Sequence, residues 1–176
     1  DFFLARFNSD GTIDTTFGAA NAGYISFDSG GGFDAIVALA VQSDGKIVVV
    51  GRQNSILFPA PVYSFAIARL TTTGALDTTF NTYGALLFNI VGGLDSQAFA
   101  VALQPDGKIL CGGDFTRYDR EGNCNYFNYI IRLNSDASVD DSFLIGAGFD
   151  SSVYTIALQS DGKILCGGYF NYYNNN

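Results

Sequence analysis

Histidine, tryptophan and methionine are absent from the 176 residues, and only three cysteines are present. Without an imidazole, the chain has no Ser-His-Asp triad, no Cys-His pair, no His-ligated zinc and no histidine general base. The three cysteines make no even disulfide framework, and no Cys-x-x-Cys pair suggests a metal ribbon. The lack of methionine predicts a segment, or a processed piece, of something longer. No catalytic residue, metal ligand or cofactor is therefore predicted.

Positive charge is also scarce, since 9 Lys and Arg stand against 17 Asp and Glu and give a net charge of -8. Such a chain is repelled by phosphate backbones and anionic membrane surfaces, so nucleic acid is not an expected partner. No apolar run approaches the roughly 20 residues of a membrane-spanning helix, so membrane insertion is not expected. With 48% hydrophobic and 15% aromatic residues, the chain should nevertheless fold around a core.

Two sequence motifs recur three times each. One contains Gln-x-Asp-Gly-Lys-Ile, and the other pairs an arginine with an aspartate eight residues later. The copies occupy residues 41–47, 103–109 and 158–164 for the first motif, and 5–17, 68–80 and 131–143 for the second. The spacing between the second and third copies of the first motif is shorter than that between the first and second. The reason is that residues 23–27 and 84–88 have no counterpart after Asp140. That dispensable segment is predicted to be an outer strand or an ordered loop.

The local pattern is β throughout. Residues 37–41 alternate with strand periodicity, Asp44-Gly45 is a hairpin signal, and residues 47–50 form a continuous apolar run. Residues 65–70 predict a third strand, and residues 76–80 predict a short fourth.

Four antiparallel strands in each unit of about 60 residues predict an all-β fold built of β-propeller blades, with a β-solenoid as the alternative. The predicted units are a partial blade at 1–33, blades at 34–94 and 95–149, and a partial blade at 150–176. Three blade equivalents fall short of the four to eight that close a ring. The rest of a longer chain, or further copies, is therefore expected to complete the propeller.

The repeated motifs resemble the delta-60 repeat family of predicted β-propellers, most clearly at residues 102–113 and 130–143. This resemblance implies the propeller fold and a setting in long bacterial surface or secreted proteins, or in phage and virus structural proteins. An extracellular, cell-surface or virion location is expected on that basis. The family brings no catalytic residues to carry over, and Ala137 departs from the turn glycine found at Gly11 and Gly74.

Most of the charge falls at repeat positions. A site for one substrate is normally built once, so charges made in every repeat predict structural Arg-Asp pairs. These pairs are expected to tie the third strand to the fourth, and they join Arg6 to Asp14, Arg69 to Asp77 and Arg132 to Asp140. No EF-hand-like loop is present, and the Asp-Gly pairs stand where hairpin turns favour them, so calcium is not predicted.

The cysteines suggest packing more than chemistry. Cys111 and Cys166 occupy one repeat position, which holds Val49 in the first copy, so both are expected to be buried. Neighbouring blades pack too far apart for a disulfide between them. Cys124 is placed in a loop, where it could be a free thiol.

The loops at 114–123 and 169–174 carry the candidate binding residues. Both follow Gly-Gly and share Phe and Tyr positions, so Phe115, Tyr118, Phe170 and Tyr173 are expected to be framework. The residues that differ between the copies are candidates for recognition, because loops on rigid scaffolds carry it. They are Arg117, Asp119, Arg120, Glu121 and Tyr172. A solvated connector is the alternative for this stretch.

The sequence thus predicts a non-enzymatic propeller segment of a larger surface or virion protein, acting as a scaffold that recognises protein or glycan. One alternative is a glycan lyase or hydrolase with a site of Asp, Tyr and Arg in the central channel. Another is a purely structural element of an appendage or filament.

Overall fold

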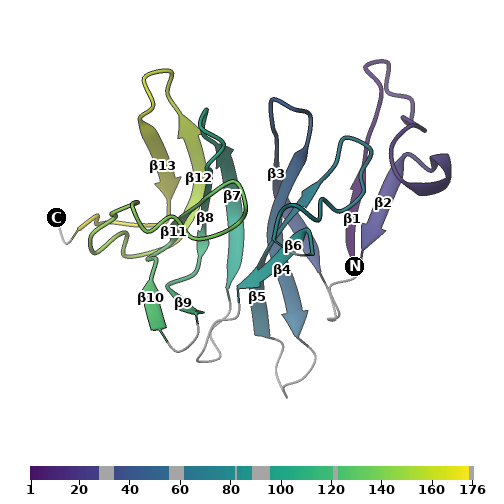
Figure 1. Ribbon diagram of the computed structural model, residues 1–176. Helices are drawn as coiled ribbons and strands as arrows, with labels where there is room; N and C mark the ends of the chain where they lie inside the picture. Colours follow the sequence, from purple (N-terminus) through teal and green to yellow (C-terminus); the bar gives the residue numbers. More distant parts are fainter. Residues whose placement is uncertain (28–33, 56–61, 82, 89–95, 121–122, 175–176) are drawn as a thin grey trace.

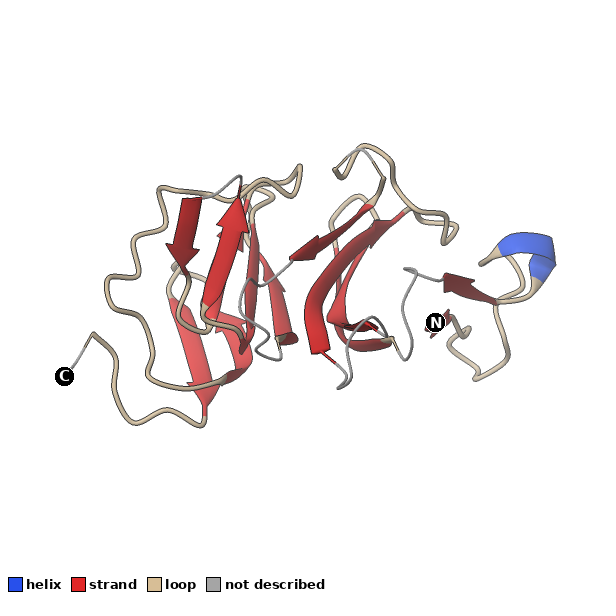
Figure 2. Cartoon of the chain, turned by 90° about the horizontal axis from the view of Figure 1, so that it is seen from below, coloured by secondary structure: helices blue, strands red, loops and turns tan. Residues whose placement is uncertain are grey.

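A computed structural model describes residues 1–27, 34–55, 62–81, 83–88, 96–120 and 123–174. Almost all of its regular structure is antiparallel β-sheet, with one 3-10 turn, η1 (Ala19–Asn21). The sheets stand side by side, with β1 and β2 at one end of the row and β12 and β13 at the other (Figures 1 and 2). This is the arrangement of propeller blades, so the predicted fold class is confirmed.

The second repeat forms a complete four-stranded blade. Its strands follow the order β3-β4-β5-β6, from the inner strand outward. They are β3 (Ala35–Val41), β4 (Ile47–Ser55), β5 (Val62–Leu70) and β6 (Ala85–Phe88). The predicted Asp-Gly hairpin joins β3 to β4, with Gly45 at φ 82° and the Lys46 N–H donating to Asp44 Oδ1 at 3.1 Å. Glycine adopts this left-handed conformation without steric cost, which explains its recurrence at the turn.

The outer strand is not the segment predicted as the fourth strand. Residues 76–80 form a turn instead, because the Phe80 N–H donates to the Asp77 carbonyl at 2.8 Å and the Thr79 N–H donates to Asp77 Oδ1 at 3.1 Å. The fourth strand is β6, which pairs with β5. In the first repeat the matching strand is β2 (Tyr24–Phe27), paired with β1 (Phe2–Ala5). The segment without a counterpart in the third repeat is therefore an outer strand, one of the two predicted options.

The third repeat forms a three-stranded sheet in the order β7-β8-β11, rather than the predicted four. A separate hairpin is inserted between β8 and β11. The strands of the sheet are β7 (Gln97–Leu103), β8 (Ile109–Asp114) and β11 (Ile130–Leu133), and those of the hairpin are β9 (Arg117–Arg120) and β10 (Asn123–Tyr126). The last repeat contributes β12 (Val153–Leu158) and β13 (Ile164–Gly168).

Each inner strand carries an irregularity at the same place. The register shifts at residues 36–38 of β3, 98–100 of β7 and 153–155 of β12. Opposite each shift lies a glycine, where a Cβ would meet an inner-strand carbonyl oxygen at about 2 Å: Gly51, Gly113 and Gly168. Only glycine tolerates this approach, so the repeated Gly follows from the bulge.

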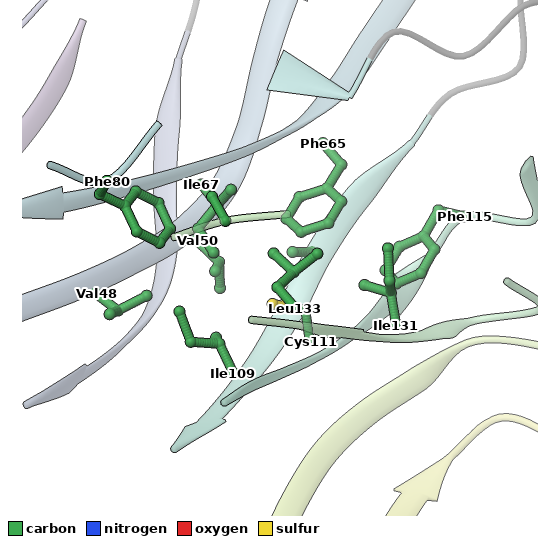
Figure 3. Packing of buried hydrophobic residues seen from close by; sticks show 12 residues of the cluster. Val48, Val50, Phe65, Ile67, Phe80, Ile109, Cys111, Phe115, Ile131 and Leu133 are labelled. Atoms are coloured by element: carbon green, nitrogen blue, oxygen red, sulfur yellow. The ribbon is translucent and has the colours of Figure 1, made fainter. Parts of the chain in front are cut away.

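The core is divided into apolar layers between consecutive sheets. The layer between the second and third blades joins side chains of β4 and β5 to those of β8 and β11 (Figure 3). Phe80, from the turn after β5, is fully buried there. Phe17 fills the repeat-related place between β1–β2 and the second blade, and is also fully buried. Packing between consecutive sheets thus buries both phenylalanines and the strand side chains around them.

Candidate functional site

The structure divides the predicted binding residues between two consecutive repeats. Arg117, Asp119 and Arg120 lie on β9, whose backbone path is described, and Glu121 lies outside the described residues. Tyr172 lies in the segment that follows β13. Both segments follow the second strand of a blade, so they leave it at the end opposite the Asp-Gly turns (Figure 1).

Two paired strands, β9 and β10, stand where a loop was predicted. It is an antiparallel ladder in which Asp119 lies opposite Cys124 and Tyr118 lies opposite Asn125. Cys124 is therefore on a strand, and its placement in a loop is wrong. β9 and β10 form a separate two-stranded sheet at this end of the third blade (Figure 1).

The segment carrying Tyr172 is fixed by one carboxylate. Asp150 Oδ1 accepts hydrogen bonds from the backbone N–H groups of Asn171 and Tyr172 at 2.9 and 3.0 Å. The Asp150 N–H donates back to the Tyr172 carbonyl at 3.3 Å. The bonds from these N–H groups outweigh burial and lower the pKa of Asp150. The Tyr172 backbone is thus held in place, while its side chain remains 58% exposed.

Aromatic contacts support the same segment. The Phe149 ring lies 4.4 Å from that of Phe170 and 5.1 Å from that of Tyr173, measured between centroids. In the preceding repeat Phe115 is buried and stacks on Phe65 at 5.2 Å. These contacts agree with the framework role predicted for the shared aromatic positions.

The repeated charges form a compact cluster in the second blade. Arg69 Nε donates to Asp77 Oδ2 at 2.7 Å, and Lys46 Nζ lies 2.9 Å from the same oxygen. Arg69 Nη2 donates to Thr79 Oγ1 at 3.0 Å, and its guanidinium carbon lies 4.8 Å above the centre of the Phe80 ring. Both charged partners of the Arg69–Asp77 pair are almost fully buried. We call these five residues the ion-pair node of the blade.

The Arg-Asp pair, with its hydroxyl partner and the phenylalanine beneath the guanidinium, is built three times, so the predicted Arg-Asp pairing is confirmed. A lysine takes part in the second and third copies of the node. Arg6 pairs with Asp14 and Arg132 with Asp140, each at 2.7 Å. Lys108 joins Asp140 at 2.9 Å. The aspartate lies in a turn and not on a fourth strand, so the pair fastens that turn to the third strand.

The sequence did not reveal that the node also reaches the next blade. Arg6 Nη1 donates to the Thr72 carbonyl at 2.6 Å, and Arg69 Nη1 donates to the Ser135 carbonyl at 2.7 Å. Both acceptors lie 66 residues further along the chain. Every residue has a backbone carbonyl, so the residue types at 72 and 135 do not mark them as acceptors. Only the equal spacing of the repeats along the chain could have suggested this contact.

Hydrogen bonding keeps the node aspartates ionised. Burial disfavours the charged form of Asp77, but hydrogen bonds from Thr79, Lys46 and Arg69 outweigh it and hold its pKa well below the ordinary value. Hydrogen bonds from Ser142 and Lys108 lower the pKa of Asp140 in the same way, against burial. A carboxylate so engaged is suited to structural pairing, and not to proton transfer.

Replacing Arg69 by lysine is expected to reduce the free energy of unfolding by about 2 kcal/mol, although the charge is kept. Arg69 reaches Asp77, Ser135 and Thr79 with three different nitrogens, whereas the three donors of a lysine ammonium share one nitrogen, which cannot reach all three acceptors. Chemical unfolding followed by circular dichroism measures the change. The matched control is Arg6→Lys, whose side chain is 34% exposed and whose loss should be smaller. Equal stabilities of all three proteins would contradict this role of the guanidinium.

The cysteines with described side chains are unsuited to nucleophilic chemistry. Cys111 is fully buried and Cys166 is half-buried, and burial raises the pKa of both thiols. A raised pKa keeps a thiol protonated and unreactive. In the part of the chain that the structure describes, no group of three or more His, Cys, Asp or Glu residues could hold a metal ion. The same residues include no helix of the length and hydrophobicity needed to cross a membrane.

A comparison with known families agrees with this repeat geometry. The description "domain of unknown function (DUF5122) beta-propeller" matches residues 1–17, 42–80, 104–143 and 159–176, well over half of the chain. The chain belongs to the DUF5122 β-propeller family. The matched ranges contain the Asp-Gly turns and the ion-pair nodes, and also the candidate binding residues Arg117, Asp119, Arg120, Glu121 and Tyr172. No curated protein matches the chain.

Proposed function

We propose that this DUF5122 segment is a non-enzymatic scaffold of a larger surface or virion protein, and that it recognises a protein or glycan. Recognition is assigned to the blade end that carries β9–β10 and the segment around Tyr172. The observation that supports this assignment best is that Asp150 fixes the Tyr172 backbone while the Tyr172 ring is exposed. A ring presented in this way can stack on a sugar or anchor a protein contact without losing much conformational entropy.

The pKa values and the partners of the node aspartates favour a scaffold over an enzyme. A glycosidase needs a carboxylic acid whose pKa is raised, next to a second carboxylate that stays ionised. The aspartates of the nodes have lowered pKa values and are paired with arginine. The resemblance to delta-60 repeats supports the surface or virion setting.

A glycan array tests this proposal, since the exposed faces of Tyr169 and Tyr172 favour a sugar as the first ligand to try. Binding to a glycan is expected, and Tyr172→Ala should weaken it at least about tenfold, in line with the loss of one stacking side chain of roughly 1.4 kcal/mol. The matched control is Tyr83→Ala, because Tyr83 is also exposed, at 76% against 58% for Tyr172, but lies before β6. Depolymerisation of the bound glycan would contradict the non-enzymatic role, and equal losses in both variants would contradict the assigned surface.

A further inference from the structure

Arg52, on β4 of the second blade, differs from the other cations in having no carboxylate partner among the described residues. Each of the other lysines and arginines whose side chain the structure describes forms an ion pair with an aspartate. They are Arg6, Lys46, Arg69, Lys108, Arg132 and Lys163. In a chain with 17 acidic residues against 9 basic ones, an arginine that no described carboxylate neutralises is unexpected.

Two contacts hold the Arg52 guanidinium in place. Its Nη1 donates to Gln97 Oε1 at 3.0 Å, and its central carbon lies 4.6 Å above the centre of the Tyr63 ring. Gln97 lies on β7 and Tyr63 on β5, so the arginine bridges the second and third blades. A guanidinium has five N–H donors, and the others are left to bind a further acceptor. Because the fork is already positioned, it loses little conformational entropy when it binds an anion.

The guanidinium lies where the apolar layer between the second and third blades ends. Arg52 follows Val48 and Val50 on one face of β4, because alternate residues of a strand share a face. It lies opposite Phe65, whose ring stacks on Phe115 at the end of that layer (Figure 3). This end of β4 is the one opposite the Asp-Gly turn, so it belongs to the blade end to which recognition is assigned (Figure 1).

The position of Arg52 is not one that the fold fixes. It follows the glycine that faces the inner-strand bulge, and the residues at this position in successive repeats are Arg52, Asp114 and Tyr169. The glycine recurs in every repeat, whereas the next residue is a cation, an anion or an aromatic ring. A position whose chemistry changes on a repeated backbone is available for recognition.

Asn54 adds a buried acceptor without a donor. It lies two residues beyond Arg52 on the same face of β4 and is 8% exposed. Its Oδ1 accepts no hydrogen bond from the described residues. A buried acceptor left in this way costs free energy, which a bound hydroxyl group would recover. Two residues along a strand span about 7 Å, so one ligand with an anionic group and a hydroxyl can engage both side chains.

We propose that Arg52 binds the carboxylate of an acidic sugar, and that Asn54 accepts a hydrogen bond from a hydroxyl of the same sugar. Two carboxylate oxygens match two N–H groups of the planar guanidinium. A sugar acid is favoured over an acidic peptide, because its ring carries hydroxyl donors beside the carboxylate. The net charge of -8 repels a densely charged chain, so the acidic sugar stands among neutral ones. This inference rests on the proposed recognition of a glycan and names the class of that glycan.

Titration with methyl glucuronide tests the site, and methyl glucoside, which lacks the carboxylate, is the matched ligand. In NMR spectra of the unmodified chain, the Nε–H signal of Arg52 should shift with the glucuronide and not with the glucoside. Arg52→Gln should bind the glucuronide at least about tenfold more weakly, because charge-assisted hydrogen bonds are lost. The control is Lys163→Gln, which removes the same charge from a side chain that is 74% exposed at the opposite blade end. It should bind as the unmodified chain does, and both variants should keep its circular dichroism spectrum.

Equal binding of the two sugars, or of neither, would overturn this inference. The glycan array with Tyr172→Ala decides the proposed function separately, because that surface does not include Arg52. Tighter binding of acetate, or of the peptide Gly-Glu-Gly with blocked ends, than of the glucuronide would overturn the assignment to a sugar. An equal loss of affinity in Arg52→Gln and Lys163→Gln would show that net charge, and not the positioned guanidinium, attracts the ligand.

Discussion

Replacing Phe80 by alanine is expected to lower the free energy of unfolding by about 3 to 5 kcal/mol. The ring is fully buried between two blades and also lies under the guanidinium of Arg69. Its removal opens a cavity that two rigid sheets cannot close, and it uncovers the ion-pair node at the same time. Urea unfolding followed by circular dichroism measures the effect.

Phe143 provides the matched control, because it holds the same repeat position but is only half-buried. Phe143→Ala should cost about 1 to 2 kcal/mol, in proportion to the smaller area removed from water. If both substitutions cost the same, burial at the junction would not be what makes Phe80 important.

The repeat pattern was the most informative feature of the sequence. Alternating residues identified β3 and β5, and a continuous apolar run after the Asp-Gly turn identified β4, because residue patterns and turn chemistry are local properties. The position of the missing segment also indicated an outer strand, since an edge strand can be removed without breaking the sheet inside it. β2 and β6 are such edge strands.

The error at residues 76–80 has a local cause. Threonine and phenylalanine favour strands, and residues 76–80 contain two threonines and one phenylalanine. Asp77 overrides this preference, because its carboxylate accepts from the Thr79 N–H and holds the backbone in a turn. A side chain that competes for backbone donors can therefore reverse a prediction made from propensity.

The candidate site was predictable in part. The differing residues between two related loops pointed to the hairpin and to Tyr172, but nothing in the sequence showed that Asp150 fixes the Tyr172 backbone. That contact spans 22 residues and joins the segment before β12 to the segment after β13. The acceptors of the arginines in the next blade were hidden for the same reason, since contacts between distant parts of the chain depend on how the blades pack.

Replacing Asp77 by asparagine is expected to cost about 3 to 5 kcal/mol at pH 6, because Arg69 and Lys46 lose the buried charge that they share. The loss should depend on pH. Since the folded-state pKa of Asp77 lies below its unfolded value of about 3.9, its contribution is complete above about pH 5 and is lost as the pH falls through the folded-state pKa.

Unfolding free energies of the unmodified chain and of Asp77→Asn, measured from pH 6 downward, should therefore converge as the pH falls below about 4. Asp14→Asn is the matched control, since Asp14 binds Arg6 but has no lysine partner among the described residues and is more exposed. Its loss should be smaller at every pH. A constant difference between the unmodified chain and Asp77→Asn across this range would show that Asp77 stabilises the blade through packing rather than through its charge.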